Sequence, residues 1–131
     1  MRPKITYAVN HLSQYLKKPT DIHWQAVKRI LRYVSSTRHF GLYIQQGSDL
    51  SISAFSDADW AANIDDRKLV AAYCIFLGGN LISWSSKKQS VVTRSSKESE
   101  YRALAHASVE IIWVRQLVCE IGVKQKSAPV L

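Results

Sequence analysis

In the first forty residues, apolar positions recur every three or four residues, which is the period of an amphipathic helix. The first run consists of Ala8, Val9, Leu12, Tyr15 and Leu16. It is interrupted by Lys17-Lys18-Pro19, because proline disfavours a helix at the residue before it. A second run covers 22–34 and follows Thr20, a favourable N-cap residue, and Asp21, whose charge suits the first turn. The pattern predicts two helices that are separated near Pro19.

After Phe40 the period shortens to that of strands. Runs rich in β-branched, aromatic and other apolar residues cover 42–44, 51–55, 73–77 and 81–84. Gly78-Gly79-Asn80 lies between the last two runs, and a two-residue turn requires residues that tolerate a positive φ. These features predict a hairpin at Gly78 and at least two further strands.

A long helix is predicted after the strands. Ser95-Ser96-Lys97-Glu98 fits a capping box at its start, and Gly122 is a suitable residue for its C-terminal end near Ile121. Strands followed by a helix, with a hairpin at the centre, are typical of an antiparallel-rich sheet with helices packed on it. The predicted fold class is therefore α/β.

Charge is distributed unevenly along the 131 residues, which suffice for one domain with a core. Residues 1–46 carry eight basic side chains against one acidic, a balance of +7, whereas 47–131 carry ten against nine. Lys28, Arg29 and Arg32 fall largely off the apolar stripe of the second helix. Two interpretations stay open, a surface that binds a polyanion such as nucleic acid and a solvated helix face without a ligand.

The remaining composition predicts an intracellular chain, in the cytoplasm or the nucleus, with no membrane partner. No stretch approaches 18 apolar residues, and no signal-peptide pattern follows Met1. Cys74 and Cys119 are expected to be buried thiols, with a disulfide as the alternative. The four tryptophans are expected to lie mostly in the core, and the four histidines, which lack metal-ligand spacing, to be surface or packing residues.

The sharpest candidate for chemistry is Ser56-Asp57-Ala58-Asp59-Trp60, which follows a predicted strand. Carboxylates at the end of a strand are exposed and fixed in direction, which suits a hard cation such as Mg²⁺. The alternative is turn chemistry, because aspartate is common in turns. For an isolated Asp-x-Asp the second interpretation is the more frequent.

Two glutamates in the predicted long helix have different expected roles. Glu98 belongs to the capping box and precedes Arg102 by four residues, which is a favourable helical pair. Glu100 shares a face with Ala103 and Ala107, so its carboxylate is expected to point toward the sheet, where it needs a partner. Binding of one metal by Asp57 and Glu100 together would meet this need. An ion pair of Glu100 with a nearby lysine or arginine is the alternative.

At these motifs the chain resembles the copia-type retrotransposon Pol polyprotein. The resemblance rests on 56–61, 65–67, the hairpin and following loop at 78–89, and Ser95 to Leu104, which is similar to the family's S-S-T-E-A-E-Y-x-A-L helix. Upstream, Arg2-Pro3, His23-Trp24 and Leu31-Arg32-Tyr33 resemble the segment that joins the reverse transcriptase to its RNase H domain. The similarity covers nearly the whole chain, with the motifs in the same order.

The resemblance implies an RNase H-like mixed sheet with packed helices, incomplete at the C-terminus. Residues 1–46 would be the helical connection segment from the end of the reverse transcriptase region plus a first strand. Residues 47–131 would be a partial RNase H-like domain. The remainder of a Pol polyprotein would be its partner.

The implied activity is Mg²⁺- or Mn²⁺-dependent cleavage of the RNA strand of RNA–DNA hybrids. Asp57 and Glu100 match the family's first and second metal-binding acids. The side chains expected to contact nucleic acid are Lys28, Arg29, Arg32, Lys87 and Lys88.

Two departures from the family pattern change this expectation. The family's third acid lies in a C-x-D-N-x-x-A type segment after the long helix, and no acid follows Glu120 here. Leu69-Val70-Ala71-Ala72-Tyr73 stands where the family has Ser-Thr-x-Gly-Tyr. The chain is therefore expected to be truncated, to hold its metal weakly if at all, and to be inactive alone. The alternatives are a non-catalytic nucleic-acid-binding relic of the same fold and, more weakly, a host interaction module.

Overall fold

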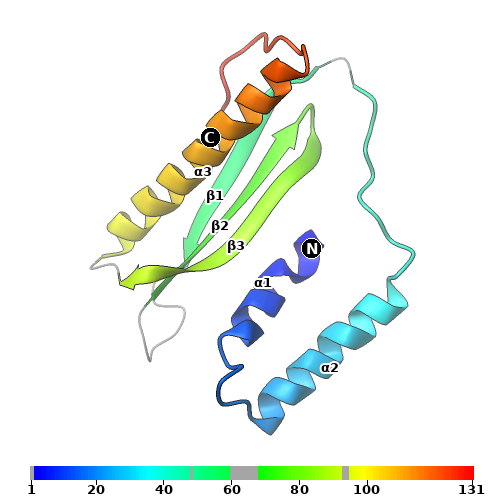
Figure 1. Ribbon diagram of the computed structural model, residues 1–131, viewed down its shortest axis with the longest axis vertical. Coiled ribbons are helices and arrows are strands. Elements are labelled where there is room, and N and C mark those ends of the chain that lie inside the picture. Colours follow the sequence, from blue (N-terminus) through cyan, green and yellow to red (C-terminus); the bar gives the residue numbers. More distant parts are fainter. Residues whose placement is uncertain (1, 48, 60–67, 93–94) are drawn as a thin grey trace. The chain divides into compact units, whose positions relative to one another are not determined.

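The computed structural model describes residues 2–47, 49–59, 68–92 and 95–131 (Figure 1). The chain divides into two compact units, here called unit 1 (residues 1–42) and unit 2 (residues 43–131). The sequence placed a boundary four residues later, between 46 and 47. No helix among the described residues is long and apolar enough to cross a membrane.

Unit 1 contains the two predicted helices, α1 (Pro3–Ser13) and α2 (Asp21–Ser36). Proline is favourable in the first turn of α1, where its missing N–H would have no helical partner. Thr20 is the N-cap of α2, as predicted, and its backbone N–H donates to Nδ1 of His23 at 3.1 Å. The start of α2 is thus fixed by residues within its own first turn.

Two side-chain contacts hold the helices of unit 1 together. The Arg2 guanidinium donates to the carbonyl oxygen and to Oγ1 of Thr37, both at 2.8 Å, and so satisfies acceptors at the C-terminal end of α2. The Tyr15 ring stacks on the His23 ring with centroids 4.0 Å apart. These contacts lock the face of α2 that carries His23 and leave its other face outward.

Unit 2 is an antiparallel sheet in the order β1-β2-β3, with α3 (Ser96–Glu120) packed on it (Figure 1). The strands are β1 (Ile52–Asp59), β2 (Lys68–Leu77) and β3 (Asn80–Val92). Leu77 pairs with Asn80, and Gly78 and Gly79 between them have φ of 56° and 81°. Positive φ at both central positions defines a type I′ turn, so the predicted hairpin and the α/β class are confirmed.

The strand predicted at 42–44 is wrong. This segment has no strand assignment, and the side chains of Leu42, Tyr43 and Ile44 are exposed. The adjacent backbone of Gln45 bonds instead to the side-chain amide of Asn80, its N–H at 2.7 Å and its carbonyl at 2.9 Å. A side chain of the hairpin therefore supplies the bonds that a neighbouring strand would have given.

The three strands are longer than the sequence predicted. Strand β1 continues through Asp59, β2 begins at Lys68, and β3 continues through the polar segment that was expected to be a loop. Pairing across the ladder overrides the weak strand propensity of such residues. The segment that lacks the family's glycine belongs to β2, with a register shift between Lys68 and Val70, and Leu69 within it is fully buried.

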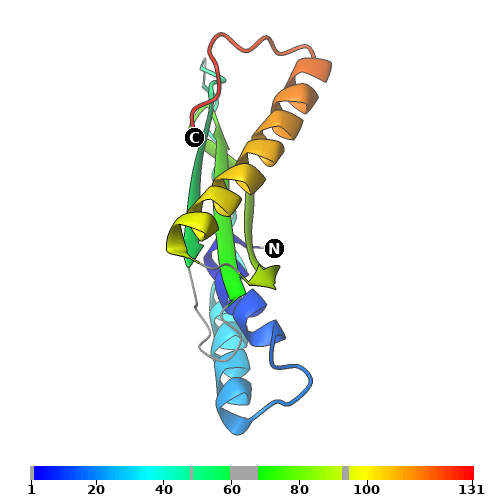
Figure 2. The same cartoon turned by 90° about the vertical axis from the view of Figure 1, so that its left-hand side faces the viewer.

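The core lies between α3 and the face of the sheet that it covers (Figure 2). Ile52, Ala54 and Ile75 pack against Ile111, Val114 and Val118, and a second cluster contains Leu69, Ala71 and Ala103. Helix α3 begins and ends where predicted, because Oγ of Ser95 accepts from the Glu98 N–H at 3.2 Å, and Gly122 adopts φ +85°. The N–H of Val123 reaches the carbonyl of Val118 at 3.1 Å, which completes a Schellman motif.

After α3 the chain returns to the outer edge of β1 (Figure 2). The Ala54 N–H donates to the Val130 carbonyl at 2.8 Å, and the Val130 N–H donates to the Ile52 carbonyl at 3.1 Å. The bridge is parallel. Strand β3, helix α3 and this tail thus form a strand–helix–extended crossover whose last part runs alongside β1.

Two composition-based expectations are wrong. Cys74 is only half-buried and Cys119 is exposed, and both are free thiols rather than a disulfide. Trp24 and Trp113 are 58% and 57% exposed, because each lies on the outer face of a helix that no further layer of its unit covers. Trp84 is half-buried, and Trp60 lies outside the described residues.

Candidate functional site

Asp57 lies within strand β1 and not, as predicted, beyond its end. It pairs with Ala72 of β2, and its Oδ1 accepts from the Ala58 N–H at 2.9 Å. The side chain is exposed. The alternative of turn chemistry does not describe this residue, because its backbone belongs to the ladder. The neighbouring motif at 65–67 lies outside the described residues.

Glu100 directly follows the first turn of α3 and is exposed, so the predicted burial of its carboxylate against the sheet is wrong. The buried side chain of that turn is Ser99, which is followed at intervals of four by Ala103 and Ala107. The buried stripe of α3 therefore runs through Ser99 and not through its neighbour Glu100. The Glu100 carboxylate lies at the edge of this stripe. Glu98 forms the predicted pair with Arg102, at 3.0 Å.

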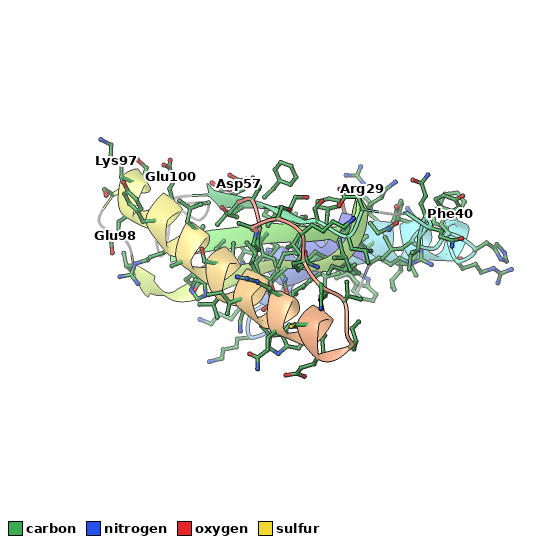
Figure 3. All side chains as sticks on the ribbon, turned by 90° about the horizontal axis from the view of Figure 1, so that it is seen from above. Arg29, Phe40, Asp57, Lys97, Glu98 and Glu100 are labelled. Atoms are coloured by element: carbon green, nitrogen blue, oxygen red, sulfur yellow. The ribbon has the colours of Figure 1, made fainter. Side chains whose placement is uncertain are left out.

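The two candidate acids line one pocket. Its walls are Ser56, Asp57 and Ala58 from β1 and Glu100, Ala103 and Leu104 from α3, and its volume is about 320 Å³. Figure 3 shows Asp57 and Glu100 on the same side of the ribbon. Among the described residues, Glu100 has no ion-pair partner, so the alternative of a pair with lysine or arginine is not seen in this part of the chain.

Small side chains create the space between β1 and the start of α3. Alternation along the strand directs Ser56 and Ala58 toward α3, as it does the buried Ala54, and Ala103 faces them from the helix. The same alternation directs Asp57 to the other side of the strand. The pocket is lined by Ser56 and Ala58 on one face of β1 and by Asp57 on the other. It therefore runs around the outer edge of β1, beyond the contact with Val130.

The pocket offers two carboxylates and a hydroxyl, which are oxygen ligands suited to a hard divalent cation. Within the described ranges, no group of three or more histidine, cysteine, aspartate or glutamate side chains could hold a metal ion. Asp57 and Glu100 could thus share one cation that keeps several waters. The described residues do not supply the larger carboxylate set that two ions would need.

The five basic candidates are divided between the units. Lys28, Arg29 and Arg32 are exposed on α2 of unit 1. On β3 of unit 2, Lys87 is exposed and Lys88 is half-buried, and as neighbours in a strand they point to opposite faces.

Sequence reasoning missed a polar cluster between α3 and the sheet. Ser83 of β3 donates to Oε1 of Glu110 at 3.1 Å, and burial, followed by the charge of Glu110, raises the pKa of Tyr73. Glu110 is seven residues after Ala103, so helical spacing alone places it on the sheet-facing side. That spacing was the available signal, and Glu110 meets the sheet more fully than Glu100 does.

The chain is similar to proteins of transposons. It is 48% identical over 130 residues to the Retrovirus-related Pol polyprotein from transposon RE2 of Arabidopsis thaliana, a match that covers 99% of the chain and 9% of that protein. Against the corresponding polyprotein from transposon TNT 1-94 of Nicotiana tabacum, identity is 41% over 125 residues, 95% of the chain and 9% of that protein. The chain thus spans about 9% of the length of these curated relatives.

A shorter relative is matched over most of its length. The chain is 42% identical over 113 residues to Secreted RxLR effector protein 161 of Plasmopara viticola, which covers 86% of the chain and 80% of that protein. No protein-family model matches the chain, and no solved structure gives a significant match.

Proposed function

We propose, from the similarity of nearly the whole chain to retrovirus-related transposon Pol polyproteins, that it is a part of such a polyprotein and carries part of an RNase H-type nuclease domain. In this proposal residues 1–46 are the connection from the reverse transcriptase region, and 47–131 are the partial nuclease domain. The substrate is the RNA strand of an RNA–DNA hybrid, and the cofactor is Mg²⁺ or Mn²⁺. The remainder of a Pol polyprotein is the partner.

The observation that carries the proposal is the shared pocket of Asp57 and Glu100. The two acids come from β1 and from the start of α3, 43 positions apart in the sequence, and line one pocket at the edge of a sheet. Two carboxylates and the Ser56 hydroxyl that line one small space are oxygen ligands that favour a hard divalent cation. The cation would orient and activate a water for attack on a phosphodiester.

The parallel contact of Val130 with β1 supports the same proposal. Residues that continued this pairing in a longer product would run beside β1 toward Asp57, because a parallel partner advances in the same direction. The family's third acid would then lie next to the pocket. The 131-residue chain by itself is expected to hold one cation weakly and to cleave little or no hybrid.

The test is Mg²⁺-dependent cleavage of a hybrid labelled on its RNA strand. The chain is compared with a longer version that adds a copia-type C-x-D-N-x-x-A segment after Leu131. We expect no cleavage by the 131-residue chain above its Asp57→Asn variant, and cleavage by the longer version. In the longer version Asp57→Asn and Glu100→Gln should each lower the rate about 100-fold or more, because each removes a charged ligand of the cation.

Glu98→Gln in the longer version is the matched control, since Glu98 lies in the same turn as Glu100 but pairs with Arg102 outside the pocket. It should keep the rate within about threefold, because an exposed i,i+4 pair contributes little to stability. A longer version that folds but does not cleave would contradict the nuclease assignment. Cleavage by the 131-residue chain that is lost in Asp57→Asn would contradict the expected inactivity.

A nucleic-acid-binding relic without turnover is the second candidate. It is favoured by the charge of unit 1, where eight basic residues face one acid in residues 1–46, and by the absence of a metal cluster of three or more such groups in the described part of the chain. Hybrid affinity that falls steeply with salt, together with no cleavage by either version, is the result that this candidate predicts.

A further inference from the structure

The outer face of α2 carries more than basic residues. Trp24 is 58% exposed and Leu31 is 57% exposed, although both are large and apolar. Helix α2 has no buried residue, and its half-buried positions are His23, Ala26, Val27, Ile30, Tyr33 and Val34. Trp24 therefore does not belong to the side that packs within unit 1.

Helical spacing places Trp24 beside the basic row, the exposed side chains of Lys28, Arg29 and Arg32. Trp24, Lys28 and Arg32 follow one another at intervals of four, which gives one line of side chains spaced about 6 Å apart along the helix axis. All three are exposed. The line thus presents one large aromatic ring followed by two cations.

The arrangement of the apolar residues distinguishes between two polyanionic partners. An anionic lipid surface favours a helix with one continuous apolar face bordered by basic residues. On α2, Trp24 and Leu31 lie on one side of the basic row, and the exposed Ile22 lies on the other side, about 160° away from Trp24 around the helix axis. On the other side of the helix the arc between Ile22 and Trp24 is occupied by the half-buried residues, so only Ile22, Leu31 and Trp24 of the apolar face are exposed. Lys28, Arg29 and Arg32 separate these exposed apolar side chains, which therefore form no continuous exposed apolar face. Nucleic acid fits this pattern better.

We propose that α2 binds single-stranded nucleic acid, with the Trp24 ring stacked on an unpaired base and with Lys28 and Arg32 on the flanking phosphates. Stacking requires a base face that a duplex does not expose, whereas the cations serve paired and unpaired strands alike. The inference rests on the proposed function for its nucleic-acid partner. It goes further by assigning an unpaired base to the Trp24 ring, whereas Lys28 and Arg32 contact the phosphates of a single strand or of a hybrid.

The test is the affinity of the full chain for a labelled oligothymidylate and for an RNA–DNA hybrid, measured by fluorescence anisotropy at fixed salt. Trp24→Ala should raise the Kd for the single strand about 5- to 100-fold, which is the effect of one lost base–aromatic stack. It should change the Kd for the hybrid by less than about twofold. Trp24→Phe keeps a ring and should stay within about threefold of the unchanged chain.

Trp113→Ala is the matched control, because Trp113 is exposed to nearly the same degree, 57%, but belongs to α3 of unit 2. It should leave both affinities unchanged. The stacking role would be overturned if Trp24→Ala and Trp113→Ala raised the Kd for the single strand equally. It would also be overturned if Trp24→Ala raised the Kd for the single strand and for the hybrid by the same factor. Circular dichroism of each variant checks that α2 is retained, and the Trp24→Phe result separates loss of the ring from loss of the fold.

Two further arms separate the inference from its premise. Lys28→Gln should weaken binding of the single strand and of the hybrid together, because it removes a phosphate contact. If no variant binds nucleic acid at all, the proposed function fails along with the inference. If Trp24→Ala abolishes binding to phosphatidylserine vesicles and leaves the oligothymidylate affinity unchanged, the face is a membrane contact and the inference is wrong.

Discussion

Gly78 starts the turn between β2 and β3, and its surroundings differ from those of Gly79. Both glycines have positive φ. A Cβ added to Gly78 would lie 2.1 Å from the carbonyl oxygen of Asp49, whereas one added to Gly79 would meet no atom within 4 Å. The close approach of the segment before β1 therefore requires glycine at the first position only.

We predict that Gly78→Ala destabilises the chain more than Gly79→Ala does. The second change carries only the cost of a left-handed backbone, about 1–2 kcal/mol. The first adds a backbone clash, so its loss should be larger by at least about 1 kcal/mol. Urea unfolding followed by tryptophan fluorescence measures both. Equal unfolding midpoints for the two variants would show that the segment before β1 moves away at no cost.

Tyr73 gives unit 2 a pH dependence on the alkaline side. Burial and the negative charge of Glu110 raise the pKa of Tyr73 above its ordinary value of 10. A group whose pKa is higher in the folded than in the unfolded state stabilises the fold below its unfolded pKa. That contribution is lost as the pH rises through about 10 and above, because the folded chain resists the ionisation that the unfolded chain accepts.

We therefore predict that the free energy of unfolding falls above pH about 10 and that Tyr73→Phe reduces this fall. Glu110→Gln should reduce it in part, since it removes the charge but not the burial. Tyr101→Phe, which changes a ring that is 73% exposed on α3, is the control and should keep the fall. An alkaline dependence that is the same in all four chains would contradict the role of Tyr73.

At the scale of elements, the outer edge of β1 is satisfied in part by the tail after α3. Ile52 and Ala54 direct their backbone groups outward to Val130, so alternation directs those of Phe55 toward β2. An edge strand with unpaired groups is a site for pairing with another chain. The tail covers the start of this edge, and the pocket lies beside the part that follows.

We predict that Val130→Pro speeds amide exchange of Ala54 by at least about tenfold, because proline cannot donate to the Ile52 carbonyl and the bridge is lost. The Phe55 amide should keep its protection, since it faces β2. Val130→Thr retains the N–H and is the matched control. Hydrogen exchange followed by NMR measures both amides, and an unchanged Ala54 rate in the proline variant would show that the tail does not hold this edge.

At the scale of the whole molecule, the net charge of +8 favours association with a polyanion such as the proposed nucleic-acid partner. Most of the excess lies in residues 1–46, but β3 of unit 2 adds Lys87 and Lys88. Each lysine on a phosphate releases counterions when it binds, so the number of contacts appears in the salt dependence of the affinity.

Hybrid affinity is predicted to fall linearly on a double-logarithmic plot against salt. Lys87→Gln should lower the slope by about 0.7–0.9, the contribution of one phosphate contact. Lys124→Gln, a change at an exposed residue after α3, should leave the slope unchanged. Equal slopes for the unchanged chain and Lys87→Gln would remove β3 from the nucleic-acid surface.

Local interactions explain which parts of this fold could be predicted from the sequence. Thr20, Gly78-Gly79 and Ser95 act on groups within three or four residues, so their neighbours in the chain suffice to place the starts of two helices and one turn. The exposure of Lys28, Arg29 and Arg32 also followed from helical period alone. The resemblance to the transposon polyproteins, read from motif order, agrees with the relatives found.

The sequence by itself thus determined the fold class, the caps and the hairpin, because each depends on short-range period or motif. It also named Asp57 and Glu100 as candidate metal ligands. Only the tertiary structure decided where the strands end, that 42–44 is not a strand, and that Glu110 meets the sheet. It also decided that Val130 pairs with β1 and that small side chains leave a pocket between β1 and α3. These depend on contacts between residues far apart in the chain, whose geometry no local pattern specifies.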